Sequence, residues 1–157
     1  MVSIDLQEQN KTLEKLESDL EKLVRDKEKL ENTIESSKAT INEAEIGIPI
    51  NETNQENMRG EIEVQRDYVN TVRDDPKALK TEKKNLAKLQ KDLDKLEREH
   101  ENFHKDIQSS KDKISQAEQD IIENQQEQES VSRQIEDQKA VVEAVKGKLE
   151  TLKKEQE

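Results

Sequence analysis

Apolar residues recur along this chain at alternating spacings of three and four. The pattern is clearest from Leu86 to Leu152, where it keeps a seven-residue repeat for almost ten heptads. If Leu86 is placed at heptad position a, Leu89 falls at d, and Leu, Ile and Val fill most of the a and d positions that follow. A helix with only this narrow stripe to bury must pair with another helix. We therefore predict an all-α fold, an elongated two-stranded coiled coil.

Residues 1–46 repeat the pattern in a frame of their own, most densely between Leu13 and Leu30. We predict that a pairing seam runs through both stretches. Its residues are Leu13, Leu16, Leu20, Leu23, Leu30, Ile34, Leu86, Leu89, Leu93, Leu96, Phe103, Ile107, Ile114, Ile121, Val131, Ile135, Val142, Val145, Leu149 and Leu152.

A first interruption is predicted near Gly47 and Pro49. Gly favours a helix end, and Pro removes a backbone donor and pushes the preceding residue toward extended geometry. Thr53 and Glu56 have the spacing of a capping box, which would restart the helix. The a positions stay in phase across this point, which favours a local kink in a continuing rod or an excursion that returns.

A second interruption is predicted at Asp74-Asp75-Pro76. Asp75 can cap a helix whose first residue is Pro76, and the heptad frame shifts here by the equivalent of a three-residue insertion, a stammer. We predict hinges at Gly47, Pro49, Asp75 and Pro76. The chain would comprise a first rod (1–46), a break with a short helical connector (47–75) and a longer rod (76–157).

The seam also predicts the kind of partner. Ile at a favours two strands, while a trimer or an antiparallel hairpin remains open. In a parallel homodimer, Asp106 would attract Lys111 but Lys148 would repel Lys153, and such mixed pairs favour a different partner chain over a second copy. Asn124 at d and Gln128 at a are polar seam residues of the kind that fix register at a cost in stability.

Composition narrows the function classes. The chain has 157 residues, of which 29% are hydrophobic and 41% charged, with a net charge of −11 and no Cys. Such a chain cannot build an ordinary globular interior. Its basic residues are interleaved with acidic ones, which argues against a nucleic-acid surface. No apolar run approaches the roughly 20 residues of a membrane span, and no secretory signal opens the sequence, so we expect a soluble intracellular protein without membrane contact.

One catalytic motif is present, His100-Glu101-Asn102-Phe103-His104, which matches the H-E-x-x-H signature of zinc proteases. The heptad frame places His100 at a, facing the partner helix, and Glu101 toward solvent. The chain contains no other His. We therefore predict an ordinary seam His, with no catalytic residue, metal or cofactor.

The segment Val72-Arg73-Asp74-Asp75-Pro76-Lys77-Ala78-Leu79-Lys80 resembles the coiled coil of the kinetochore subunit Nuf-two, although that family more often has Ser where this chain has Asp75. The resemblance implies a heterodimeric rod of the outer kinetochore complex that attaches microtubules. It also implies a location in the nucleus, at the centromere, and a role in chromosome segregation and cell division.

The sequence thus predicts a structural protein rather than an enzyme: a rod that dimerises with a partner helix and acts as a spacer or scaffold. The alternatives are a homodimeric tether in trafficking or chromosome organisation, and a helical insertion that regulates a larger enzyme.

Overall fold

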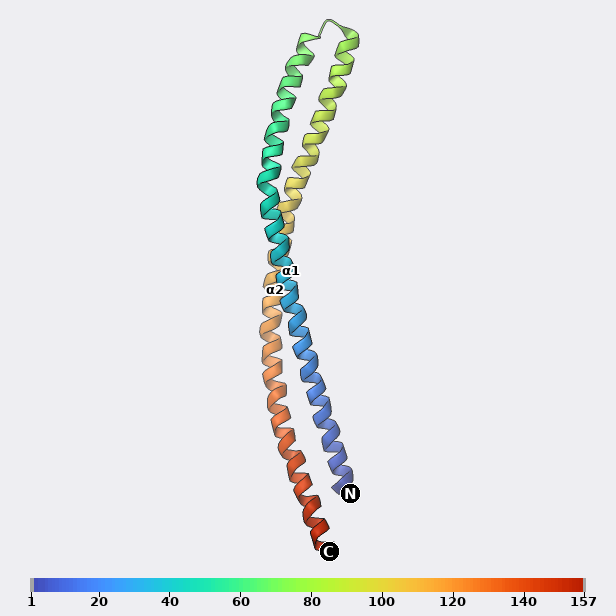
Figure 1. Cartoon of the computed structure of the whole chain (residues 1–157), viewed down its shortest axis with the longest axis vertical. Helices are drawn as coiled ribbons and strands as arrows, with labels where there is room; N and C mark the ends of the chain where they lie inside the picture. The colour runs from blue at the N-terminus through green and yellow to red at the C-terminus, as the bar shows by residue number, and fades with distance from the viewer. Residues whose placement is uncertain (1, 157) are drawn as a thin grey trace. The chain divides into compact units, whose positions relative to one another are not determined.

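The protein is all-α, as predicted. The computed structural model describes residues 2–156, and these form two helices, α1 (Val2–Thr71) and α2 (Pro76–Gln156) (Figure 1). No strand occurs among the described residues. Long heptad stripes in a sequence almost free of Gly and Pro favour helices of this length, because each stripe finds an apolar surface to cover it.

The helices form two compact units, and each unit pairs a segment of α1 with a segment of α2. Unit 1 comprises Met1–Glu35 and Ser115–Glu157, and unit 2 comprises Ser36–Ile114. Within each unit the two segments run in opposite directions, as their interhelical hydrogen bonds show below. The seam of α1 is therefore covered by α2 of the same chain, so the antiparallel hairpin, which the sequence left open, is the observed arrangement.

The predicted interruption near Gly47 and Pro49 is wrong, because α1 continues through both residues and through Thr53 and Glu56. Pro49 occupies heptad position b and is exposed. Because Pro has no backbone N–H, the carbonyl of Glu45, four residues earlier, loses its intrahelical donor and can accept from water instead. Gly47 does not have positive φ, the backbone conformation that commonly ends a helix at Gly. The heptad phase, which is preserved across this point, indicated a continuing helix, whereas Gly47 and Pro49 indicated a break.

The predicted interruption at Asp74–Pro76 is confirmed, but as a reversal of the chain. The Asp75 amide donates to the Val72 carbonyl (3.0 Å), which closes the turn between the helices. The Asp75 carboxylate accepts a hydrogen bond from the Ala78 amide (3.3 Å), and its carbonyl accepts one from Leu79 (2.8 Å). Asp75 is thus the N-cap of α2 and Pro76 its first residue, as predicted. The stammer interpretation is wrong, because the two frames belong to antiparallel helices.

The core of each helix pair is narrow and unusually polar. The buried apolar residues are Ala44, Ile62, Ala117, Ile135, Val142 and Val145, and the buried polar ones are Ser37, Asn51, Gln55, Ser110 and Asn124. Of the predicted seam residues, Ile135, Val142 and Val145 are buried, Leu152 is 43% exposed, and the others are half-buried. A single partner helix covers a stripe only in part, so polar contacts at the seam carry much of the pairing geometry.

Candidate functional site: an amide ladder between the helices

A buried, hydrogen-bonded polar site in unit 2 centres on Asn51 of α1. This residue is 1% exposed, and its Nδ2 donates to the Leu96 carbonyl of α2 (2.9 Å) and to Glu99 Oε1 (3.0 Å). On its other side, Gln55 Nε2 donates to Asn51 Oδ1 (2.6 Å), and Arg59 donates to Gln55 Oε1 (2.9 Å). Both amide groups of this Asn–Gln pair are therefore satisfied, although they lie inside an apolar stripe.

Unit 1 contains the same arrangement, with the helices exchanged. Asn124 of α2 donates from Nδ2 to the Leu23 carbonyl of α1 (2.9 Å), and Gln128 Nε2 donates to Asn124 Oδ1 (2.6 Å). In both units an Asn at d is followed four residues later by a Gln at a, which is one helical turn. We call this repeated arrangement, Asn51 with Gln55 and Asn124 with Gln128, the Asn–Gln clasp.

Two further interhelical amide contacts extend the ladder. Gln138 of α2 donates from Nε2 to the carbonyl and to the side-chain oxygen of Gln9 of α1, both at 2.8 Å. Gln65 of α1 donates to the carbonyl of Glu82 (3.0 Å) and to its carboxylate (2.7 Å).

These contacts define one antiparallel register. In unit 1, moving two heptads forward along α1 from Gln9 to Leu23 requires moving two heptads back along α2, from Gln138 to Asn124. In unit 2, two heptads forward from Asn51 to Gln65 likewise match two heptads back on α2, from Leu96 to Glu82. The heptad correspondence is therefore fixed in the same way inside each unit.

The ladder favours this register more than it adds to stability. A hydrogen bond inside a protein contributes only about 1 kcal/mol net, but a buried amide left without a partner costs about 1–3 kcal/mol. Among residues 2–156, every buried side-chain nitrogen and oxygen has a partner. A slip by one heptad would place Gln65 opposite Leu89 and Gln138 opposite Leu16, where the side-chain acceptors of Glu82 and Gln9 are lost, so the penalty falls on the alternative registers.

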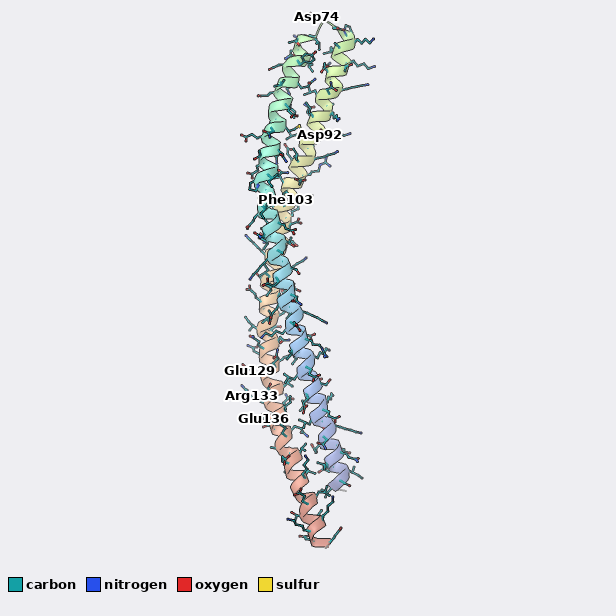
Figure 2. The ribbon with its side chains drawn as sticks, in the orientation of Figure 1. Asp74, Asp92, Phe103, Glu129, Arg133 and Glu136 are labelled. Atoms are coloured by element: carbon teal, nitrogen blue, oxygen red, sulfur yellow. The ribbon has the colours of Figure 1, made fainter. Side chains whose placement is uncertain are left out.

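Gly47 marks a close approach of the helices in unit 2. A Cβ atom added at Gly47 would lie 2.6 Å from Phe103 Cζ, so the ring of this α2 residue (labelled in Figure 2) packs directly on the α1 backbone. Ala44, one turn earlier, is small and 3% exposed. Gly47, which we predicted as a hinge, provides room for the largest apolar side chain of the seam.

His100 lies at the seam of unit 2 and contacts α1, as its heptad position predicted. Its Nε2 lies 3.1 Å from Glu52 Oε1, and its ring meets that of His104 edge to face at 4.7 Å between centroids. Glu101 is 3.7 Å from Lys105 on the outer face. Within the described part of the chain, no three His, Cys, Asp or Glu side chains are grouped so that they could hold a metal ion.

Sequence reasoning found half of the Asn–Gln clasp and missed the rest. Asn124 and Gln128 were predicted as register-fixing seam residues, whereas Asn51 and Gln55 lay in a segment taken for a helix break. The signal was available, because Asn51 continues the d series of α1 and Gln55 the a series.

Comparisons with protein families, with curated proteins and with solved structures found no match for this chain. Neither helix contains, within residues 2–156, an apolar stretch that could cross a membrane. Fold and site together define the class: an antiparallel helical hairpin whose seam carries a regular amide ladder.

Proposed function

We propose that the chain is a structural helical hairpin that serves as a spacer and scaffold. The observation that carries this proposal is the amide ladder, since four interhelical contacts at heptad intervals define a single pairing within each unit. A pairing fixed in this way sets how far each unit extends and which residues face outward, which are the properties that a spacer needs. In unit 2 the α1 segment, residues 36–71, extends about 54 Å at 1.5 Å per residue.

Engineered disulfides test this pairing in a chain that has no Cys of its own. Ser37 and Ser110 are both buried in unit 2, and they lie two heptads from Asn51 and Leu96 in the observed register. We expect S37C/S110C to oxidise within one chain, giving a compact monomer on a non-reducing gel. The matched control is S37C/S109C, because Ser109 is adjacent in sequence but exposed at position c. Equal oxidation in both variants, or disulfides only between chains, would overturn the hairpin.

A narrower candidate is the rod of a kinetochore complex that attaches microtubules, which the resemblance at Val72–Lys80 supports. This role requires the seam to accept a different chain in place of the chain's own second helix. Light scattering on the reduced S37C/S110C chain mixed with a candidate partner tests it: a one-to-one complex, in which later oxidation no longer forms the intrachain disulfide, is the expected result. A chain that keeps its hairpin in the mixture contradicts the role. The homodimeric tether predicts the same loss without any partner.

A further inference from the structure

The outer face of α2 in unit 2 is predominantly basic, and Asp94 at position b is its one acidic residue. Seven basic residues follow one another at spacings of three or four, at positions b, c and f, which lie opposite the seam. They are Lys77, Lys80, Lys84, Lys88, Lys91, Lys95 and Arg98, and all are exposed. We call this the α2 outer face. Among residues 2–156, none of the seven lies within ion-pairing distance of a carboxylate. Asp94, three residues from Lys91 and four from Arg98, offsets only part of this positive charge.

The outer face of α1 in unit 2 has the opposite character. Since eighteen residues make about five helical turns, Ile46 lies in line with Val64, and Ile50 with Tyr68. These four side chains are 51–70% exposed. The stripe between them carries no charge in a chain that is 41% charged. The α1 outer face consists of Ile46, Ile50, Thr53, Asn57, Gly60, Val64 and Tyr68.

Acidic residues outnumber basic ones beside this uncharged stripe. Six exposed carboxylates border it, against two exposed basic residues, Arg59 and Arg66, of which Arg59 contacts Gln55 and Glu97. The flanking residues are Glu43, Glu45, Glu56, Glu61, Glu63 and Asp67. Unit 2 therefore presents an apolar, acid-bordered face on one helix and a basic face on the other.

Unit 1 does not separate its charges in this way. Lys15 and Lys22 alternate with Glu14 and Glu21 on its α1 segment. On its α2 segment, Glu129, Arg133 and Glu136 project together away from α1 (Figure 2). The separation in unit 2 is thus a local feature and does not follow from composition alone.

We propose that two copies of this chain associate side by side through unit 2, with the α2 outer face of one copy against the α1 outer face of the other. Every chain carries both complementary surfaces, so no further partner is needed. Lys and Arg stems cover exposed apolar side chains well while their charged ends reach carboxylates at the border. The two faces point away from each other across the hairpin, so the contact is heterologous and leaves one face of each kind free for the next copy. The inference depends on the hairpin pairing but not on its use as a spacer.

The contact should be weak and dependent on salt. Residues 46–68 extend about 35 Å along the helix, but only four of the side chains on the α1 outer face are apolar. Much of the attraction is therefore between exposed charges, which salt screens.

Sedimentation velocity of the full chain at several concentrations tests the proposal. In about 0.1 M salt the average mass should rise with concentration, and in about 1 M salt, where the Debye length is about 3 Å, this rise should disappear. K84E/K88E/K91E should weaken association by about tenfold or more, because attractive pairs become repulsive. The control K11E/K15E/K22E has the same net charge but changes the outer face of unit 1, and it should stay within about twofold of the unmodified chain.

A charge swap decides whether the two faces meet each other. E56K/E63K/D67K should fail to self-associate, as should K84E/K88E/K91E, yet a mixture of the two should recover association because each offers the face that the other lacks. Circular dichroism checks that both variants keep the helical content of the unmodified chain. Absence of recovery in the mixture, or equal weakening by the control variant, would overturn the proposal. A chain that stays monomeric but binds a labelled duplex oligonucleotide through Lys84, Lys88 and Lys91 would also overturn it, in favour of a polyanion site.

Discussion

At the scale of single residues, Gly47 shows how burial changes the meaning of a sequence signal. Gly next to Pro normally indicates a helix end. In this hairpin the missing side chain lets the Phe103 ring reach the α1 backbone, while Pro49 is exposed, so the Glu45 carbonyl that lacks its donor can accept from water. Neither fact can be read locally, because the neighbour of Gly47 is supplied by a helix more than fifty residues away in sequence. The heptad phase, a longer-range signal, predicted the continuous helix.

The first prediction compares two Gly→Ala changes inside α1. Gly60 has no atom within 4 Å of an added Cβ, so G60A should raise the free energy of unfolding by about 1 kcal/mol through helix propensity alone. G47A gains the same propensity but forces Phe103 to move, which should cost about 1–3 kcal/mol. Urea unfolding followed by circular dichroism measures the difference. Two variants of equal stability would contradict the close approach.

Replacing Phe103 by the smaller Leu tests whether the penalty of G47A comes from crowding against the ring or from the backbone of α1. In the F103L background the added methyl group has room, so the penalty of G47A should shrink toward the value for G60A. A double-mutant cycle should therefore give a coupling of about 1 kcal/mol between Gly47 and Phe103. Additive effects would mean that the penalty arises in the backbone of α1.

Asp75 is the residue whose role the sequence predicted most completely, since both capping hydrogen bonds and the following Pro76 are observed. D75A should lower the free energy of unfolding by about 1 kcal/mol, the usual value of an N-cap side chain. D74A is the control, because Asp74 is an exposed turn residue outside both helices. Thermal unfolding of the two variants compares them directly, and similar losses in both would contradict the capping role.

At the scale of the helices, heptad analysis predicted which residues face the seam but not which residues face one another. The a and d positions are set by local periodicity, whereas the register depends on contacts such as Asn51 with Leu96, between residues 45 positions apart. The Asn–Gln clasp could have been found as a repeated pattern, Asn at d and Gln at a. The carbonyl that each Asn contacts could not have been found, because registers that differ by a whole heptad all fit the pattern of a and d positions on the two helices.

Replacing the clasp should separate stability from specificity. N51L/Q55L/N124L/Q128L exchanges both members of each clasp for apolar side chains, so no clasp amide is left unpaired and thermal stability should stay similar or rise. The register should become less strictly defined, because the buried amides that favour one pairing are gone. With S37C as a fixed partner, disulfides to Phe103→Cys, one heptad from Ser110, should become detectable only in this fourfold background. If the register remained unique, the contacts of Gln65 and Gln138 would be the stronger determinant.

At the scale of the whole chain, the turn at residues 72–75 decides that the two seams meet within one molecule. From sequence alone, the frame shift at Pro76 fits a stammer in a continuing rod as well as the start of a second, antiparallel helix. Both interpretations bury the same apolar residues. The two interpretations differ in the short turn that the Asp75–Val72 hydrogen bond closes. This local contact decides whether the helices pair within one chain or between two chains.

Making the turn helical should therefore convert the hairpin into an exchanged dimer. D75A/P76A removes the cap and the residue that prevents helix continuation, and a continuous helix must place its α2 seam on the α1 seam of a second copy. Light scattering in about 1 M salt, which suppresses contacts between outer faces, should report a dimer. In this background the S37C/S110C disulfide should join two chains instead of closing within one. D74A, which keeps Asp75 and Pro76, should remain a hairpin under the same conditions. A monomeric D75A/P76A chain with an intrachain disulfide would show that the pairing of the helices, rather than the turn, determines the reversal.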